Sequence, residues 1–204
     1  MADEVITAKS RIITEPGRLS FPSLFKPEIK KDAKTGVETA WYCASLLLPK
    51  ATTDLGKLRT LAEAVLSERW PDAGKRPKKL RSVLHDGDAE TWDGYAGCWF
   101  IRTKSKMQPG IIDCRKQAIT SESVLYPGCW VRLLIGAYAY DTEGNAGVTL
   151  SLYHVLKVKD DEPFGNRIDA VDAFAGFTTD APDGSEDPKN YPAGDKGGDS
   201  DLPF

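Results

Sequence analysis

Apolar and polar residues alternate along much of the chain, which is the pattern of β-strands that bury one face. The two longest alternating stretches, 129–140 and 147–159, are joined by DTEGNAG, a segment that favours a tight turn between antiparallel strands. Shorter stretches of strand character cover 8–13, 18–25, 38–48, 94–103 and 110–114. The pattern therefore predicts a mainly β fold.

One stretch has a helical period instead of an alternating one. Its apolar residues, spaced mostly three and four apart, are Leu55, Leu58, Leu61, Ala62, Val65 and Leu66. Thr53 or Asp54 can cap the first turn, and Pro71 cannot continue a helix. The sequence therefore predicts one main helix over 54–70.

The alternation also assigns a face to each residue of a predicted strand. The inward residues include Val131, Leu133 and Ile135 on 129–140, and Leu150, Leu152, His154, Leu156 and Val158 on 147–159. The outward residues are Phe100, Arg102, Lys104 and Lys106; Trp130, Arg132, Tyr138 and Tyr140; and Tyr153 and Lys157. Three strands are thus expected to present aromatic and basic side chains on their outer faces.

Such faces suit single-stranded DNA, which needs positive charge along its phosphates and flat rings on which unpaired bases stack. The alternative for any one ring is that it covers a second layer of core under the helix or a loop. The collective pattern, rather than a single ring, favours single-stranded DNA binding.

Two further basic groups are candidate phosphate contacts. The segment KRPKKLR, which follows the predicted helix, contributes Lys75, Arg76, Lys78, Lys79 and Arg81. The second group is Arg115 and Lys116. For KRPKKLR the alternatives are a solvated surface run without a ligand, which is what charge runs usually are, or a match to a localisation signal.

Charge is distributed unevenly along the 204 residues, whose formal net charge is −3. Residues 1–164 hold 24 basic and 21 acidic side chains, whereas residues 165–204 hold 3 and 9. The sequence therefore predicts a basic body, with 41% hydrophobic residues in the whole chain to supply a core, and an acidic tail.

The tail itself divides into two parts. Residues 178–204 are rich in Gly, Pro and acidic residues, so we expect this stretch to be disordered. Upstream, Ile168, Val171, Phe174 and Phe177 recur every three residues after Asn166. This spacing predicts a short helix within 166–177 that docks the root of the tail.

Catalytic and metal-binding motifs are scarce. The sequence has no P-loop, no HExxH and no nucleophile elbow, and its four cysteines form no CxxC pair. We therefore expect no enzyme activity, no cofactor and no metal. The alternative is a two-metal nuclease built on the acidic stretch 85–93.

Membrane and secretory signals are also lacking in the sequence. The longest apolar run, Leu133 to Tyr140, has eight residues, whereas a membrane span needs roughly 18 to 20. Asp3 and Glu4 stand where a secretory leader carries positive charge. We expect a cytosolic protein without a membrane partner.

The ending DSDLPF resembles the acidic C-terminal tip of bacterial single-stranded DNA-binding proteins, which typically finish Asp-Asp-Asp-Ile-Pro-Phe. The matching residues are Asp199, Asp201, Leu202, Pro203 and Phe204. In those proteins the terminal Phe enters an apolar pocket on partner enzymes. The resemblance implies that this tip recruits a helicase, primase, polymerase or nuclease; the alternative for a terminal Phe is a PDZ-like pocket.

Three segments of the body resemble a phage-encoded family of single-stranded DNA-binding proteins: HDGDAETWDGYAGCWFIRTKSKMQPGIID, YPGCWVRLLIGAYAYDTEGNAGVTLSLYHVLKV and DDEPFG. The resemblance covers most of residues 5–165. It implies an OB-fold, a five-stranded Greek-key barrel related to the helix-destabilising proteins of lytic phages, with the aromatic and basic faces in its oligonucleotide groove. It also implies the cytoplasm of an infected bacterium.

Together these observations predict an OB-fold domain over 1–165, a docking segment over 166–177 and an acidic tail over 178–204. The expected function is sequence-independent coating and protection of single-stranded DNA in phage replication or recombination, with enzymes recruited through the tail. An annealing protein with the same groove is the nearest alternative, and a purely protein-binding adaptor is another. The sequence leaves self-association open.

Overall fold

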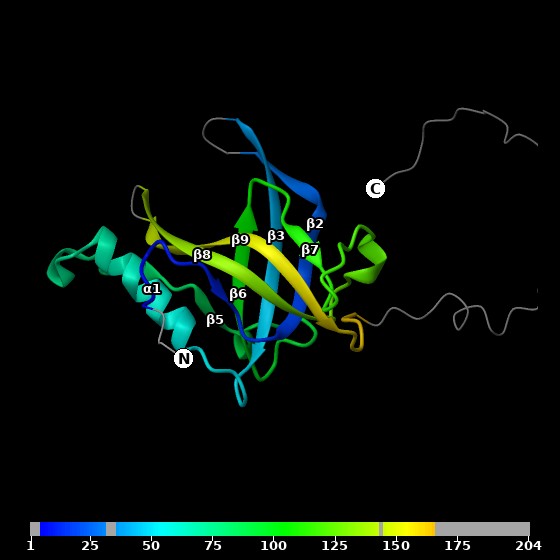
Figure 1. The fold of residues 1–204 in the computed structure, drawn as a ribbon. Helices are drawn as coiled ribbons and strands as arrows, with labels where there is room; N and C mark the ends of the chain where they lie inside the picture. The colour runs from blue at the N-terminus through cyan, green and yellow to red at the C-terminus, as the bar shows by residue number, and fades with distance from the viewer. Residues whose placement is uncertain (1–4, 32–35, 143–144, 166–204) are drawn as a thin grey trace, which may run out of the picture. The chain divides into compact units, whose positions relative to one another are not determined.

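The computed structural model describes residues 5–31, 36–142 and 145–165 (Figure 1). The strands in this part of the chain are β1 (Ile12–Ile13), β2 (Gly17–Lys31), β3 (Glu38–Pro49), β4 (Leu80–Arg81), β5 (Leu84–Asp86), β6 (Cys98–Ser105), β7 (Gly110–Ile112), β8 (Trp130–Thr142) and β9 (Asn145–Lys159). The helices are α1 (Gly56–Arg69) and three short 3₁₀ turns, η1 (Ala73–Lys75), η2 (Gly87–Ala89) and η3 (Glu122–Val124).

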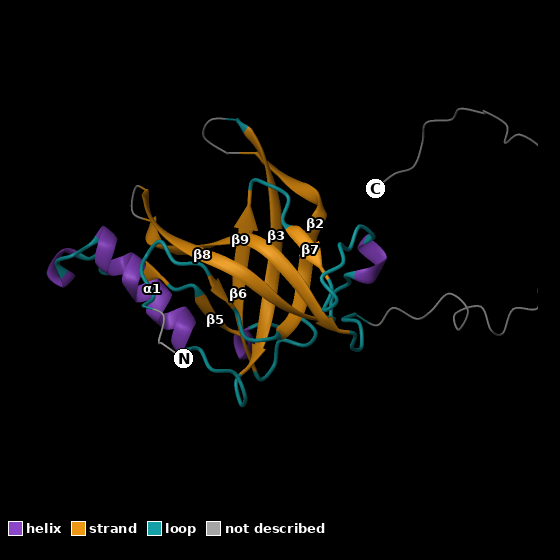
Figure 2. Ribbon diagram, viewed as in Figure 1, coloured by secondary structure: helices purple, strands orange, loops and turns teal. Residues whose placement is uncertain are grey.

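Five of these strands close into a barrel (Figure 2). Around the ring, β2 pairs with β3, β3 with β6, β6 with β9, β9 with β8, and β8 with β2. All of these pairs are antiparallel except β6 with β9. The first strand of the ring therefore pairs with the second and the fourth, and the third pairs with the fifth. This is the five-stranded Greek-key barrel of an OB-fold, and it confirms the predicted fold class.

Helix α1 covers one side of the barrel, next to β8 (Figure 2). Leu58, Leu61 and Val65 are buried, because residues three and four apart share one face of a helix. The carboxylate of Asp54 accepts a hydrogen bond from the Gly56 backbone N–H at 2.8 Å, close to the predicted cap. The helix ends before Pro71, as predicted.

Alternating residues of the barrel strands fill its interior. Val131, Leu133 and Ile135 of β8 are fully buried, as the alternation predicted. Most buried apolar residues belong to one large cluster. A second, smaller cluster joins Phe100, Leu47 and Tyr95 outside the barrel wall. Phe100 is only 1% exposed and belongs to the core. Its predicted place on an open DNA-binding face is therefore wrong.

An irregularity in β9 changes which residues face inward. Leu134 pairs with His154 and Ile135 with Leu152, so that Tyr153 is an extra residue on β9. Beyond it, Val155 is buried and His154 is exposed. The predicted inward placement of His154, and with it of Leu156 and Val158, is therefore wrong, because one inserted residue inverts the alternation.

Other differences concern short elements. Of the predicted strand 8–13 only Ile12–Ile13 pairs, and β4 and β5 were not predicted. Within the described part, no helix is both long enough and apolar enough to cross a membrane. The predicted docking helix of 166–177 and the tail of 178–204 lie outside the described residues.

Candidate nucleic-acid interface

Three adjoining depressions cross the outer surface of the barrel. Their volumes are about 540, 500 and 430 Å³. Lys104 lines all three, Arg102 and Thr149 line the first two, and Tyr138 lines the last two. We call the continuous surface the groove. Its principal lining residues are Phe21, Lys30, Trp41, Cys43, Ser45, Arg81, His85, Trp92, Arg102, Lys104, Lys106, Tyr138, Tyr140, Thr149 and Tyr153.

The register of the barrel explains why these side chains meet. Cys43 and Ser45 of β3 lie opposite Lys104 and Arg102 of β6, so all four emerge on the outer face. Lys104 in turn lies opposite Ser151 of β9. The groove therefore crosses strands that are fixed by backbone hydrogen bonds. In an OB-fold this is the face that binds oligonucleotides and oligosaccharides.

Cations and aromatic rings lie side by side along the groove. The ammonium nitrogens of Lys104 and Lys106 lie 4.7 and 5.5 Å from the centroid of the Trp41 ring. The Arg102 guanidinium carbon lies 5.7 Å from the centroid of the Trp92 ring. A strand of nucleic acid laid across such a surface meets positive charge and stacking surfaces within one nucleotide of each other.

Several predicted site residues line the groove: Arg81, Arg102, Lys104, Lys106, Tyr138, Tyr140 and Tyr153. Tyr138 is 42% exposed, which leaves part of its ring accessible to a ligand. Burial of the rest of the side chain, and to a smaller extent Tyr140, raises the pKa of the Tyr138 phenol. The phenol therefore stays neutral at physiological pH and does not repel phosphate.

Lys157 occupies a different environment from the one predicted. Its side chain is only 11% exposed, and its ammonium lies 2.6 Å from a carboxylate oxygen of Asp160. The inverted alternation of β9 sets Lys157 opposite Val131, a buried residue of β8. This lysine stabilises the end of β9 and lines none of the three depressions.

The first half of the outer face of β8 is occupied by other parts of the chain. The Arg132 guanidinium donates to the Thr14 carbonyl at 2.8 Å and lies 3.6 Å from the Glu15 carboxylate. The Trp130 indole N–H donates to Asp161 at 2.5 Å. Neither Trp130 nor Arg132 lines the groove, because segments before β2 and after β9 contact them. Sequence alternation alone gives no sign of those segments.

The basic run of 75–81 divides in the structure. Arg76 donates to Glu63 at 2.8 Å and lies within 3.5 Å of the Trp70 carbonyl, so it fastens the loop to α1. Lys75 lies 3.5 Å from Asp72. Lys78 and Lys79 are exposed outside the groove, as are Arg115 and Lys116 in the turn after β7. Of the two basic groups, only Arg81 lines the groove.

The acidic stretch 85–93 is a turn held together by one lysine. The Lys50 ammonium lies 2.5 Å from Asp86 and 2.6 Å from Asp88. The hydrogen bonds from Lys50 lower the pKa of both carboxyls. Asp88 also accepts from the Gly97 N–H at 2.6 Å. The carboxylates are thus used in folding the turn, and no group of three potential metal ligands occurs in the part of the chain described here.

Eight of the principal groove residues were not predicted as site residues from the sequence: Phe21, Lys30, Trp41, Cys43, Ser45, His85, Trp92 and Thr149. Trp41 could have been predicted from the sequence, because the apolar residues Ala44, Leu46 and Leu48 occupy even positions and so assign the odd positions of this strand to the outer face. His85 stacks on Phe100 at 4.9 Å, and burial, with Arg102, lowers the pKa of its imidazole. Its neutral ring forms part of the groove wall.

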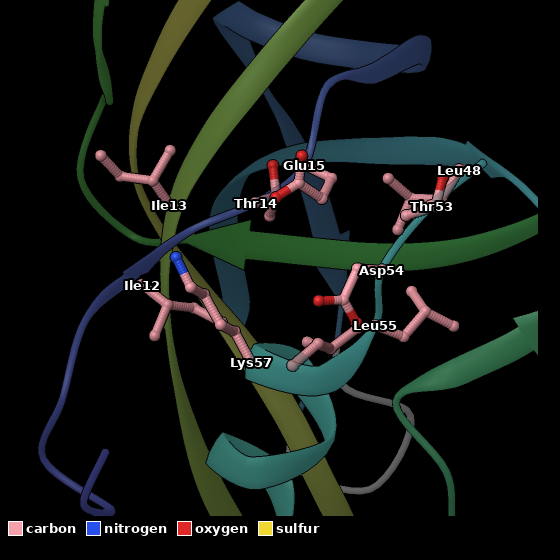
Figure 3. A pocket seen from close by; sticks show the side chains of 10 residues that line it. Ile12, Ile13, Thr14, Glu15, Leu48, Thr53, Asp54, Leu55 and Lys57 are labelled. Atoms are coloured by element: carbon pink, nitrogen blue, oxygen red, sulfur yellow. The ribbon is translucent and has the colours of Figure 1, made fainter. Parts of the chain in front are cut away.

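A separate small pocket lies between β1 and the start of α1 (Figure 3). Ile12 and Glu15 line one side, and Asp54 and Lys57 line the other. Its accessible volume is about 20 Å³, room for about one water molecule. It shares no lining residue with the groove and is too small for a nucleotide.

Comparison with known proteins places this architecture among phage proteins. The family described as "Enterobacter phage Enc34, ssDNA-binding protein" matches residues 10–186. Protein p50 of Acyrthosiphon pisum secondary endosymbiont phage 1 is 32% identical over 169 residues, which cover 77% of this chain and 88% of p50.

Solved structures agree with this grouping. The single-stranded DNA-binding protein from bacteriophage Enc34, in complex with ssDNA, is 25% identical, with a TM-score of 0.62, over 80% of this chain and 100% of that one. The single-stranded DNA-binding protein gp2.5 of bacteriophage T7 shares the fold, with a TM-score of 0.53 at 14% identity, over 79% of this chain and 98% of that one.

Proposed function

Because this chain belongs to the family of the Enterobacter phage Enc34 single-stranded DNA-binding protein, we propose that it binds single-stranded DNA in the groove. The observation that carries the proposal is the continuity of the three depressions, in which exposed rings lie beside lysine and arginine side chains. Stacking on such rings is insensitive to base identity, since every base has a π-face. Binding is therefore independent of sequence.

Titration of the intrinsic tryptophan fluorescence tests this proposal. Trp41 and Trp92 line the groove, so oligo-dT should quench the emission saturably, more strongly than a duplex of equal length, and less at moderate than at low salt. A wild-type protein that shows neither quenching nor a gel shift with oligo-dT would overturn the proposal.

In the infected cell, this binding would coat and protect exposed single strands during phage replication or recombination. A protein that binds single strands in preference to duplex favours melting of hairpins by mass action, without ATP and without catalysis. The site of action is the host bacterial cytoplasm. A strand-annealing assay separates this role from an annealing protein, which would accelerate the pairing of complementary strands.

The C-terminal tip would recruit replication or recombination enzymes. Asp199, Asp201, Leu202, Pro203 and Phe204 carry the resemblance to the bacterial tip. A long acidic tether lets a partner bind while the groove holds DNA. Full-length protein should retain a helicase, primase, polymerase or nuclease on an affinity column, and Phe204→Ala should release it. Equal retention by both would contradict the role of the tip.

A further inference from the structure

One end of the groove carries two exposed aromatic rings that lie outside the strand pattern. We propose that Phe21 and Trp92 form a distinct subsite for one unpaired nucleobase, with Arg102 beside its phosphate. The inference rests on the proposed single-stranded DNA binding and adds a named recognition site to it. It is independent of the rings on β3, β8 and β9.

Phe21 has a backbone conformation that is unfavourable for a bulky side chain. Its φ is 44°, in the left-handed region that bulky L-residues rarely adopt, and it lies at an irregularity of β2 between Ser20 and Ser23. The irregularity turns the ring outward, where it is 55% exposed, while Leu19 and Leu24 of the same strand are buried. Backbone strain and an exposed ring both count against folding, and such features cluster at ligand sites.

Trp92 meets Phe21 from the loop before β6. The two ring centroids lie 5.3 Å apart at 77°, an edge-to-face arrangement, and Trp92 is 41% exposed. Because the rings are nearly perpendicular and in contact, no base fits between them. A base can stack on the open face of one ring, with the edge of the other beside it.

Buried neighbours hold the two rings in place. The Tyr95 ring is buried and lies 5.1 Å from Trp92 and 6.3 Å from Phe21, and its hydroxyl donates to Ser20 Oγ at 3.2 Å. The loop is also fastened from the other side, since Asp93 accepts from the Gly165 N–H at 2.9 Å. The subsite is therefore preorganised, which lowers the entropic cost of binding.

The charge around the pair suits a nucleotide better than an apolar protein segment. Arg102 and Lys104 line the same depression of about 540 Å³ as Phe21 and Trp92, and the Arg102 guanidinium carbon lies 5.7 Å from the centroid of the Trp92 ring. The depression also contains Glu28, which is paired with Lys30, and Arg102 lies 3.7 Å from Glu90. Because Arg102 is 55% exposed, its guanidinium remains accessible to a phosphate. The depression opens directly into the rest of the groove through Arg102, Lys104 and Thr149. A strand bound along the groove can thus extend one further base onto the pair.

The variant Phe21→Gly separates binding from folding. Glycine adopts a positive φ without steric cost, and this relief opposes the loss of the ring contacts with Trp92 and Tyr95, so the variant should still fold, as thermal melting can verify. Its affinity for oligo-dT should fall about 5- to 100-fold, the range for loss of one base stack. The matched control is Val124→Ala, which shortens another exposed apolar side chain away from the groove. Unchanged affinity of a folded Phe21→Gly variant would overturn the subsite.

Trp92 provides a second, independent measurement. Trp92→Ala should show a similar loss, and Trp92→Phe should restore most of the affinity. In the full-length wild-type protein, oligo-dT carrying 5-iododeoxyuridine should form ultraviolet cross-links at Phe21 or Trp92. If wild type binds oligo-dT, the cross-links map elsewhere and the Trp92 variants bind as tightly as wild type, the subsite is wrong but DNA binding in the groove is not contradicted. If wild type does not bind oligo-dT, the proposed function itself fails.

Discussion

The ammonium of Lys104 lies 4.7 Å from the centre of the Trp41 indole ring, across the boundary between β6 and β3. A cation over an aromatic face is weakly stabilised in the free protein. Single-stranded DNA offers both partners something stronger, since the lysine gains a phosphate and the indole gains a base. We therefore expect Lys104 to contact a phosphate and Trp41 to stack on a base of the same strand.

The first prediction concerns the ring of this pair. Trp41→Ala should weaken oligo-dT binding about 5- to 100-fold through the loss of one stacked base, and Trp41→Phe should restore most of it. Fluorescence anisotropy of a labelled oligonucleotide measures both. Because Trp41 is half-buried, thermal melting of each variant serves as the folding control. A folded alanine variant with wild-type affinity would remove Trp41 from the binding face.

The second prediction concerns charge. Lys104→Gln should reduce the slope of log affinity against log salt by about 0.7, the value for one phosphate contact on a single strand. Lys116→Gln changes the same charge in an exposed turn outside the groove and should leave the slope unchanged. Equal changes in the two variants would mean that the DNA is bound by the whole basic body and not by the groove.

How much of this site was predictable depends on how regular the strands are. Arg102 and Lys104 were placed correctly on an outer face, because their neighbours Ile101 and Thr103 on β6 are buried. Lys106, just after the end of β6, also lines the groove. Tyr138 and Tyr140 of β8 follow the same logic. The strand pattern predicted a mainly β fold, and the resemblance to a phage family implied the barrel.

The sequence predictions fail where tertiary structure, rather than the local alternation of apolar and polar residues, determines the position of a side chain. The extra residue at Tyr153 inverted the alternation, so Lys157 was placed on the wrong face. Arg132 was placed correctly by parity, but the segment around Thr14 covers it. Phe21 and Trp92 belong to a strand irregularity and a loop, for which the sequence contains no period to detect.

The third prediction separates two arginines of the same basic run. Arg76→Ala should lower the free energy of unfolding by about 1 kcal/mol, since it removes the ion pair with Glu63, and should leave DNA affinity unchanged. Arg81→Ala should lower DNA affinity and leave the free energy of unfolding unchanged, because Arg81 lines the groove. Denaturant unfolding and oligo-dT titration of both variants give the four values needed. Equal losses of DNA affinity would show that the run acts as one phosphate-binding segment.

The fourth prediction concerns acid stability. Lys50 lowers the pKa of Asp86 and Asp88 below the ordinary value of 3.8, so both carboxylates favour the folded state when ionised. This stabilisation is present above pH 3.8 and is lost as the pH falls through the lower folded-state values. The difference in urea midpoint between wild type and Lys50→Gln should therefore shrink as the pH falls below about 4.

The same carboxylates decide the nuclease alternative. Asp86→Asn with Asp88→Asn should reduce stability at neutral pH, because the turn loses its ion pairs with Lys50. DNA incubated with magnesium and wild-type protein should remain intact. Magnesium-dependent cleavage that the double variant abolishes would contradict a purely structural role for this turn.

The fifth prediction concerns the acidic tail. Residues 178–204 carry seven acidic side chains against two lysines. The last described residue, Gly165, donates its backbone N–H to Asp93, the neighbour of groove residue Trp92. A tethered polyanion competes with DNA phosphates for the same cations. Deleting 178–204 should therefore tighten oligo-dT binding at low salt, and the gain should vanish at high salt as the competition is screened.

Two variants distinguish charge from other properties of the tail. Replacing its seven acidic residues by Asn and Gln keeps the length and should reproduce the tightening caused by the deletion. Phe204→Ala keeps the charge of the tail and should bind DNA as wild type does, because electrostatic competition depends on the acidic residues and not on the terminal ring. If the deletion binds equally or more weakly at low salt, the tail does not compete for the groove. If Phe204→Ala tightens binding as much as the deletion does, the ring and not the charge is responsible.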